Sequence, residues 1–241
     1  MLFRSNLLGA DANLLLGADA TAPKLNEAIE SNPPRVLHLA THGLMGSSER
    51  PLLASLALTT PAEPTLGDTG FVTLEDILST WGARLKGTEL VVLSACDTAR
   101  GVQQGDTSMA LPLGLFVCGA ETVIASQWKV DDTATALLMS RFYANWLGKT
   151  DSERVIDGIT YAPGQSLSKL AALREAQAWL RGLNSEQVAT ITAAMSGTDG
   201  VTAVAQFTRG GDDELADATS SDFPFAHPFY WSAFVLYGSP E

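Results

Sequence analysis

The sequence predicts an α/β fold with a mostly parallel β-sheet and helices on both of its faces. Two observations support it. Short segments such as "VLHLA", "ELVVLSA" and "TVIASQW" are apolar at almost every position, which is typical of parallel strands that helices cover on both sides. Between these segments lie longer stretches with helix start and stop signals, so strands and helices alternate along the chain.

The first third of the chain is expected to hold one helix and the first inner strand. Residues 23–31 begin at a proline and end before "SNPP", because proline cannot continue a helix. The inner strand follows at 35–41. Residues 50–60 are apolar, and the segment after them, "AEPTLGDTG", is rich in turn-forming residues. A loop or a hairpin is therefore expected there.

The middle of the chain is expected to add a short helix and the second inner strand. Thr73 and Asp76 have the spacing of a capping box, which opens a helix through Leu78. The strand follows at 89–95. A further helix is expected from about 107 to 117, with a glycine at its end.

The last part is expected to supply a third inner strand at 122–128, two long helices and a final strand. Either Asp131 or Asp132 caps the first of these helices, which a glycine closes. The second helix spans 166–181, and the final strand lies in "WSAFVLYG". We expect one domain over residues 1–241 with a flexible insertion at 185–222, since most of 196–222 is Gly, Asp, Ser and Thr.

Composition excludes several classes of function. The chain has 241 residues, 46% of them apolar, which is enough for a globular core. A net charge of -12 argues against direct nucleic-acid binding and favours cationic peptides as partners. No apolar run approaches the length of a membrane helix, and acidic residues flank "ANLLLGA", so we expect a cytoplasmic protein without a membrane contact. Two cysteines are too few for a disulfide framework and lack the His or Cys clustering of a metal site. No cofactor is expected.

Two inner strands lead to residues that suit acyl transfer. His42 and Cys96 follow these strands and lie 54 residues apart. In parallel sheets the carboxyl ends of neighbouring strands meet at one edge, where ligands bind. An imidazole beside a thiol favours the thiolate and can later protonate a leaving amine. Gly43 lets its backbone N–H approach a reacting carbonyl, and the N–H of Cys96 is a second candidate donor.

Each of these residue types also has a purely structural interpretation. A His-Gly pair is often only a turn, and a lone cysteine such as Cys96 is often a small core residue. Cys118 lies in an apolar helix and is expected to be a buried, inert thiol. His38, inside a strand, is expected to be a core histidine, and His227 is expected to pack before the final strand.

Taken together, "VLHLATHG", "LVVLSACDTARG", "GLFVCGAETVIASQWKVDD" and "HPFYWSAFVLYG", in this order, resemble the CHAT family of caspase-like proteases, relatives of caspases and separase. The resemblance implies a caspase-haemoglobinase fold and peptide-bond hydrolysis through a thioester. It implies a metal-free dyad of His42, as base and acid, and Cys96, as nucleophile. In "SQWKVDD" it makes Asp132 the candidate for binding the side chain that precedes the cut bond, against the alternative that Asp132 only caps a helix.

The resemblance also carries expectations about partners. CHAT domains usually have a further strand and helix before the part that matches "LLLGADAT", and they are usually attached to sensor or repeat modules, so we expect this domain to lack its N-terminal part. The leading hypothesis is an endopeptidase that cleaves a protein partner and is activated by such a module. The alternative is a catalytically silent domain that holds a peptide in the same cleft. A glutaminase or amidase is disfavoured, because it would place cysteine in a Gly-x-Cys-x-Gly elbow before the histidine.

Overall fold

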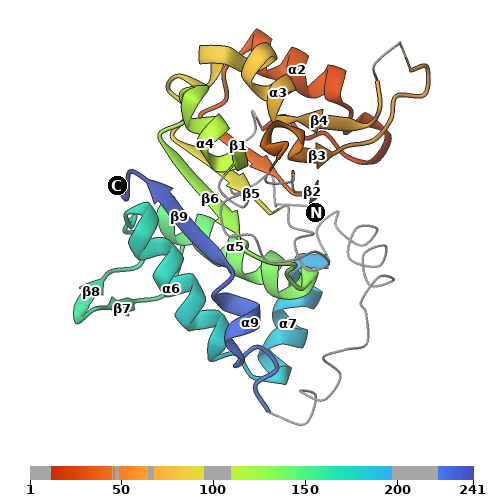
Figure 1. Ribbon diagram of the computed structural model, residues 1–241. Coiled ribbons are helices and arrows are strands. Elements are labelled where there is room, and N and C mark those ends of the chain that lie inside the picture. The colour runs from red at the N-terminus through yellow and green to blue at the C-terminus, as the bar shows by residue number, and fades with distance from the viewer. Residues whose placement is uncertain (1–11, 45, 47–48, 65–67, 95–109, 197–221) are drawn as a thin grey trace. The chain divides into compact units, whose positions relative to one another are not determined.

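The computed structural model describes residues 12–44, 46, 49–64, 68–94, 110–196 and 222–241. The chain divides into two compact units, each discontinuous in sequence. The sheet unit comprises Asn13–Lys129 and Phe234–Ser239, and the helical unit comprises Met1–Ala12, Val130–Ala233 and Pro240–Glu241. Figure 1 labels the α-helices and β-strands of both units.

The described elements of the sheet unit are, in chain order, η1 (Gly17–Asp19), α2 (Ala22–Ser31), β1 (Val36–Leu39), β2 (His42–Leu44), η2 (Pro51–Leu53), β3 (Ser55–Ala57), β4 (Phe71–Thr73), α3 (Leu74–Asp76), η3 (Ile77–Trp81), η4 (Gly82–Leu85), β5 (Leu90–Leu93), α4 (Ala110–Val117), β6 (Thr122–Ser126) and β9 (Phe234–Gly238). Those of the helical unit are α5 (Asp132–Trp146), β7 (Arg154–Ile156), β8 (Ile159–Tyr161), α6 (Lys169–Arg181), α7 (Ser185–Ser196) and α9 (Pro228–Trp231).

The main sheet of the sheet unit has the described strand order β1-β5-β6-β9 (Figure 1). β1, β5 and β6 are parallel neighbours, and β9 pairs with β6 in the antiparallel direction. Every residue of β5 and β6 is buried, as expected for inner strands. The prediction of an α/β protein with a mostly parallel central sheet is therefore confirmed.

A second, antiparallel sheet has the order β2-β3-β4. β3 and β4 form the hairpin expected around "AEPTLGDTG", where Leu58 donates its N–H to the Gly70 carbonyl. Gly70 has φ +76°, a conformation that favours glycine. The first inner strand was expected to reach residue 41, but β1 ends at Leu39. The chain bends at Thr41, whose hydroxyl donates to the Ala57 carbonyl, and then enters β2.

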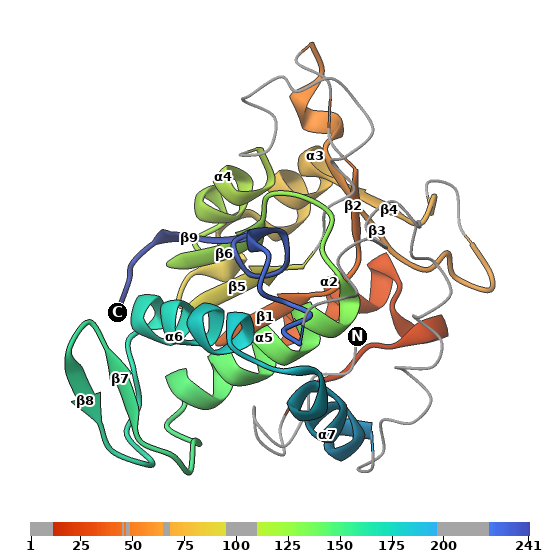
Figure 2. The ribbon, with the colours of Figure 1, turned by 90° about the horizontal axis from the view of Figure 1, so that it is seen from below.

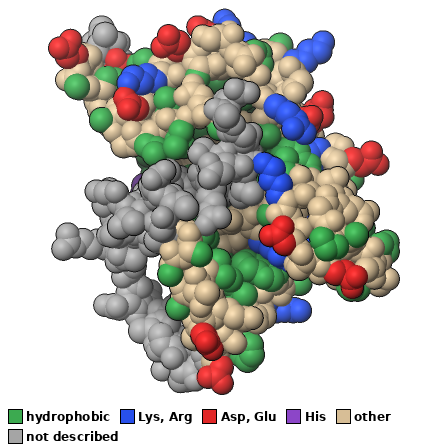
Figure 3. Space-filling view, turned by 180° about the vertical axis from the view of Figure 1, so that it is seen from behind, with side chains coloured by type: hydrophobic (Ala, Val, Ile, Leu, Met, Phe, Trp, Pro, Cys, Tyr) green, Lys and Arg blue, Asp and Glu red, His purple; other side chains and the backbone are tan. Residues whose placement is uncertain are grey.

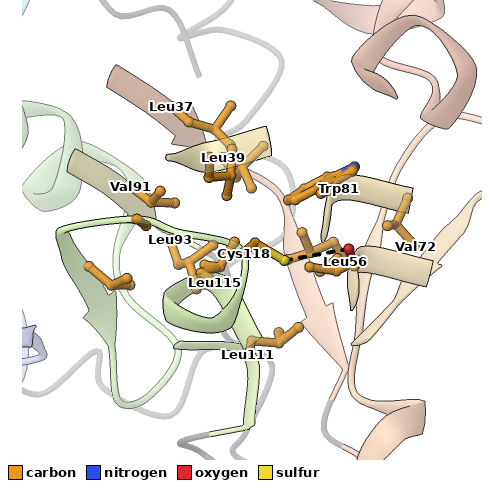
Figure 4. Close-up of a cluster of buried hydrophobic side chains, with 14 of the residues drawn as sticks. Leu37, Leu39, Leu56, Val72, Trp81, Val91, Leu93, Leu111, Leu115 and Cys118 are labelled. Atoms are coloured by element: carbon orange, nitrogen blue, oxygen red, sulfur yellow. Dashed lines mark hydrogen bonds between the residues drawn. The ribbon is translucent and has the colours of Figure 1, made fainter. Parts of the chain in front are cut away.

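Helices α2, α3 and α4 pack against one face of the main sheet and build the core that Figure 4 shows. Side chains of alternate strand residues, such as Leu37 and Val91, meet Leu115 of α4 and Trp81 of η3 there. The Trp81 indole N–H donates to the Asn26 side chain at 2.8 Å, which satisfies its buried donor. Val92 and Ile124 point to the opposite face of the sheet and are also fully buried.

Local signals set the helix ends of the sheet unit. Thr73 and Asp76 form the expected capping box, with the Asp76 N–H donating to the Thr73 hydroxyl and the Thr73 N–H to the Asp76 carboxylate. The helix continues beyond Leu78 as the π-helical turn η3. Gly119, just beyond α4, has φ +107°, and a Cβ there would lie 2.7 Å from the Lys86 backbone nitrogen. Only glycine suits that position.

In the helical unit, α5 and α6 lie side by side (Figures 1 and 2). Asp131 is the N-cap of α5 and accepts the Ala134 N–H at 2.8 Å. Gly148 follows α5 with φ +65°, as predicted for a closing glycine. The helix expected from residue 166 begins three residues later, because Ser168 is its N-cap. Among the described residues, no helix combines the length and the apolar character that crossing a bilayer requires.

Two elements of the helical unit differ from the sequence expectation. A hairpin, β7–β8, turns at Asp157 and Gly158, which have φ 51° and 81°, the signs of a type I′ turn. Helix α7 occupies the first twelve residues of the segment expected to be a flexible insertion. Asn184 and Gln187 cap its start reciprocally, each side chain accepting the other's backbone N–H. Residues 197–221 of that segment lie outside the described residues.

A polar network links α5, α6 and the hairpin of the helical unit. Glu175 accepts a two-pronged hydrogen bond from Arg141 and a third bond from Asn145. Arg154, only 3% exposed, donates to the carbonyls of Ala162 and Gln165 at 2.7 and 2.8 Å. Its other terminal nitrogen lies 3.4 Å from the Asn145 side-chain oxygen. The network fixes the loop before α6 to α5.

Candidate active site

His42 is the first residue of β2 and lies three residues beyond the end of β1. It was expected at the end of an inner strand; instead it opens the antiparallel ladder with β3, opposite Ala57. The hydrogen bond from the Thr41 hydroxyl to Ala57 fixes the chain immediately before it. The His42 side chain is exposed, so its imidazole is accessible to a ligand.

Cys96 belongs to residues 95–109, which lie outside the described residues, so the His42–Cys96 pair stays a prediction. The register of the strands that lead to the two residues is described. Each pair between β1 and β5 joins residues 54 positions apart, from Val36 opposite Leu90 to Leu39 opposite Leu93. The Ser94 N–H continues this ladder and donates to the Leu39 carbonyl at 3.0 Å. His42 and Cys96 are also 54 positions apart in the sequence.

Gly43 is buried and lies opposite Leu56 in the β2–β3 ladder. Because glycine has no side chain, a neighbouring group can approach the backbone of β2 closely at this position. Its expected part in catalysis, donating the backbone N–H to an oxyanion, stays a prediction.

The two aspartates at the start of α5 have different positions. Asp131 is the N-cap, so it takes the capping role that the sequence left open between the two. Asp132 is the first residue inside the helix and is exposed. Capping therefore does not explain Asp132. Because Asp132 belongs to the helical unit and His42 to the sheet unit, its role in binding a substrate stays a prediction.

Cys118 is the buried thiol that the sequence predicted. It is 0% exposed, and its Sγ lies 3.6 Å from the Ile77 carbonyl oxygen, the contact dashed in Figure 4. Burial raises the pKa of the Cys118 thiol, which keeps it protonated and unreactive. It is an internal reference thiol for measuring the reactivity of Cys96.

The other two histidines have structural contacts, but both are less buried than predicted, since His38 is not a fully buried core residue and His227 is exposed. His38 is half-buried, with Nε2 lying 3.4 Å from the Ser94 hydroxyl. Burial lowers the pKa of His38 to about 3, so its ring is neutral at physiological pH. His227 caps α9, where its Nδ1 accepts the Phe229 N–H at 3.2 Å.

Sequence reasoning missed the surface on which His42 lies. In the β2-β3-β4 sheet, Gly43, Leu56 and Val72 occupy the inward face and are buried. His42 and Phe71 lie on the opposite face, with Ala57 between them. Strands of three residues have too short a pattern to be detected by periodicity alone, and no local signal marks β2.

The described surface has mixed charge. On the face that Figure 3 shows, Lys and Arg side chains are interspersed with Asp and Glu. Within the described ranges, no three side chains of His, Cys, Asp or Glu are arranged so that they could hold a metal ion.

The protein is an α/β protein in which, by sequence, a histidine and a cysteine each come three residues after one of two paired parallel strands. The model of the CHAT domain matches residues 2–239, nearly the whole chain and both compact units. The chain therefore belongs to the CHAT domain family, which is related to the caspase-like cysteine peptidases. A search of curated proteins finds no match.

Proposed function

We propose that this chain is a cysteine endopeptidase of the caspase type. Cys96 is the nucleophile and His42 is the base and acid. The backbone N–H groups of Gly43 and Cys96 are the proposed donors to the oxyanion. The proposal includes a caspase-haemoglobinase fold and a peptide or protein substrate in the cytoplasm, and it needs no metal or other cofactor.

The proposed reaction has two steps. The Cys96 thiolate, formed by proton transfer to His42, attacks the carbonyl carbon of the peptide bond. The C–N bond breaks, the imidazolium of His42 gives its proton to the leaving amine, and a thioester remains on Cys96. His42 then takes a proton from water, which attacks the thioester; the C–S bond breaks and the carboxylic acid and the free thiol are released.

The β1–β5 register is the observation that carries the proposal. Adjacent parallel strands lie about 4.8 Å apart. Leu39 and Leu93 are directly paired, and His42 and Cys96 each follow one of them by three residues. A register shifted by a few residues would have separated the two positions along the sheet edge. Family membership supports the same pairing.

Substrate preference and regulation extend the proposal. Asp132 is exposed and is not the helix cap, and its carboxylate has the charge that a basic side chain before the cut bond would require. The net charge of -12 favours the approach of such a peptide. We also propose that an associated sensor or repeat module activates the enzyme, because CHAT domains are commonly attached to such modules.

The test measures the two thiols separately. Iodoacetamide reacts with the thiolate, and mass spectrometry distinguishes peptides that contain Cys96 from those that contain Cys118. At pH 7 we expect Cys96 to be alkylated at least tenfold faster than Cys118, which burial protects. His42→Ala should slow the alkylation of Cys96, because the variant has no imidazolium to favour the Cys96 thiolate. His227→Asn, which keeps a capping side chain on α9, is the matched control and should leave the rate unchanged.

Covalent labelling by a substrate-like inhibitor is the second readout. An acyloxymethyl ketone with a Lys or Arg side chain next to the reactive carbon should label Cys96 covalently in the wild type and fail to label the His42→Ala variant. Equal alkylation rates at the two thiols, or an alkylation rate at Cys96 that is unchanged in the His42→Ala variant, would contradict the dyad. Peptide binding by the Cys96→Ala variant without any cleavage by the wild type would favour the silent peptide-binding domain.

A further inference from the structure

The outward face of the β2-β3-β4 sheet comprises His42 and Leu44 from β2, Ser55 and Ala57 from β3, and Phe71 and Thr73 from β4. His42, Leu44 and Phe71 are exposed, whereas Ser55 is buried. Residues directly opposite each other in antiparallel strands point to the same side of a sheet. The register pairs His42 with Ala57 and Ala57 with Phe71, so these three form one row across the sheet. The neighbouring row is Leu44, Ser55 and Thr73.

This outward face exposes apolar groups in two directions from His42. Phe71, across the row, is 43% exposed, and Leu44, along β2, is 41% exposed. Isolated exposed apolar residues are common on protein surfaces. These two instead lie on the face that carries the candidate catalytic base, and the other five residues of that face have no charged side chain. The face therefore suits an apolar group rather than a charged one.

Strand geometry relates Phe71 to the bond that is cut. Strands in a sheet are about 4.8 Å apart, so a residue two strands away from His42 lies roughly 10 Å from it. An extended peptide advances about 3.3 Å per residue. A peptide whose cut bond lies at His42 and which crosses the sheet reaches Phe71 after about three residues, and the small side chain of Ala57 leaves room between them.

We infer that the outward face of the β2-β3-β4 sheet is a specificity surface for the peptide substrate, with Phe71 contacting an apolar side chain two to four residues from the cut bond. This inference rests on the proposed function, because His42 at the cut bond fixes where the peptide lies. It adds an apolar requirement distinct from the basic side chain assigned to Asp132.

The test compares peptides that differ by Leu or Ser at one position, two to four residues to either side of a fixed cut bond. In the wild type we expect Leu to raise kcat/KM about tenfold at one of these positions, which corresponds to ~1.4 kcal/mol. Phe71→Ala should abolish that preference, and Phe71→Leu should restore most of it. Phe223→Ala is the matched control, since Phe223 is 47% exposed and belongs to the helical unit, and it should leave the preference intact.

Binding to the Cys96→Ala variant, measured by fluorescence anisotropy with the same peptides, separates this inference from the proposed function. Phe71-dependent binding of the Leu peptide without cleavage by the wild type supports the surface and overturns the peptidase. Cleavage with a Leu preference that survives Phe71→Ala, or with no Leu preference at any position, overturns the surface and leaves the peptidase standing. Absence of Phe71-dependent binding to every peptide also overturns the surface.

Discussion

Replacing Arg154 by methionine should destabilise the helical unit. The guanidinium is almost fully buried and donates two short hydrogen bonds to the carbonyls of Ala162 and Gln165, besides the longer one to Asn145. Hydrogen bonds to a charged group contribute about 1.5–3 kcal/mol each. Methionine fills a similar volume and avoids the cost of burying a charge, which offsets part of the loss.

The net loss from Arg154→Met is then about 3 kcal/mol. In a chain of this size, each kcal/mol changes Tm by about 2–4 °C, so the transition should shift down by about 6–12 °C. Differential scanning calorimetry suits the measurement because two compact units need not unfold in one transition. Arg154→Lys should fall between the wild type and Arg154→Met, because an ammonium keeps the charge but lacks the planar fork.

Arg174→Met is the matched control. Arg174 pairs with Asp157 at the hairpin tip, but both side chains are more than half exposed. An exposed ion pair contributes at most about 1 kcal/mol, so the control should shift Tm by less than 4 °C. If Arg154→Met melts within 2 °C of the wild type, or no lower than Arg174→Met, the buried guanidinium does not hold the loop to α5 and the reasoning is wrong.

Two further predictions concern the aspartates at the start of α5 and the histidine inside β1. Asp131→Ala removes the cap of α5 and should cost about 1 kcal/mol of stability. Asp132→Asn should leave Tm nearly unchanged but lower kcat/KM about tenfold for peptides with Arg before the cut bond. The reverse pattern would mean that the roles of the two aspartates are exchanged. The pKa of His38 is about 3 in the folded chain and about 6.5 when unfolded, so the unfolded state gains a proton as the pH falls below 6.5 and stability decreases by up to ~1.4 kcal/mol per pH unit. His38→Gln should reduce this decrease in urea unfolding between pH 7 and pH 5, and an equal decrease in both proteins would contradict the assignment.

The inner strands and most helix ends could be predicted because their signals are local. The capping box at Thr73 and Asp76 and the glycines at 119 and 148 act within one helical turn of where they occur. Asp131 and Asp132 satisfied the capping rule equally in the sequence, and only the structure identified Asp131 as the N-cap of α5. The register of β1 against β5 could not be predicted at all, because it depends on packing between segments more than 50 residues apart.

The elements that the sequence analysis did not predict were missed for two different reasons. The β7–β8 hairpin has a strong local signal, since Asp157-Gly158 between β-branched residues is typical of a type I′ turn, and it was available in the sequence. Strand β2 has no such signal. It exists because residues 42–44 pair with β3, more than ten positions further along. The outward face around His42 could therefore be recognised only after that pairing was known.

The strand order of the main sheet also determines when the sheet can be completed during synthesis. β9 occupies a described end of that sheet, yet it follows α5, α6 and α7 in the chain. During synthesis, β6 has one side without its final neighbour until residues 234–238 have left the ribosome. An unpaired strand edge is a site for aggregation, so stalled or truncated products ending before residue 234 should depend on chaperones more than the full chain does.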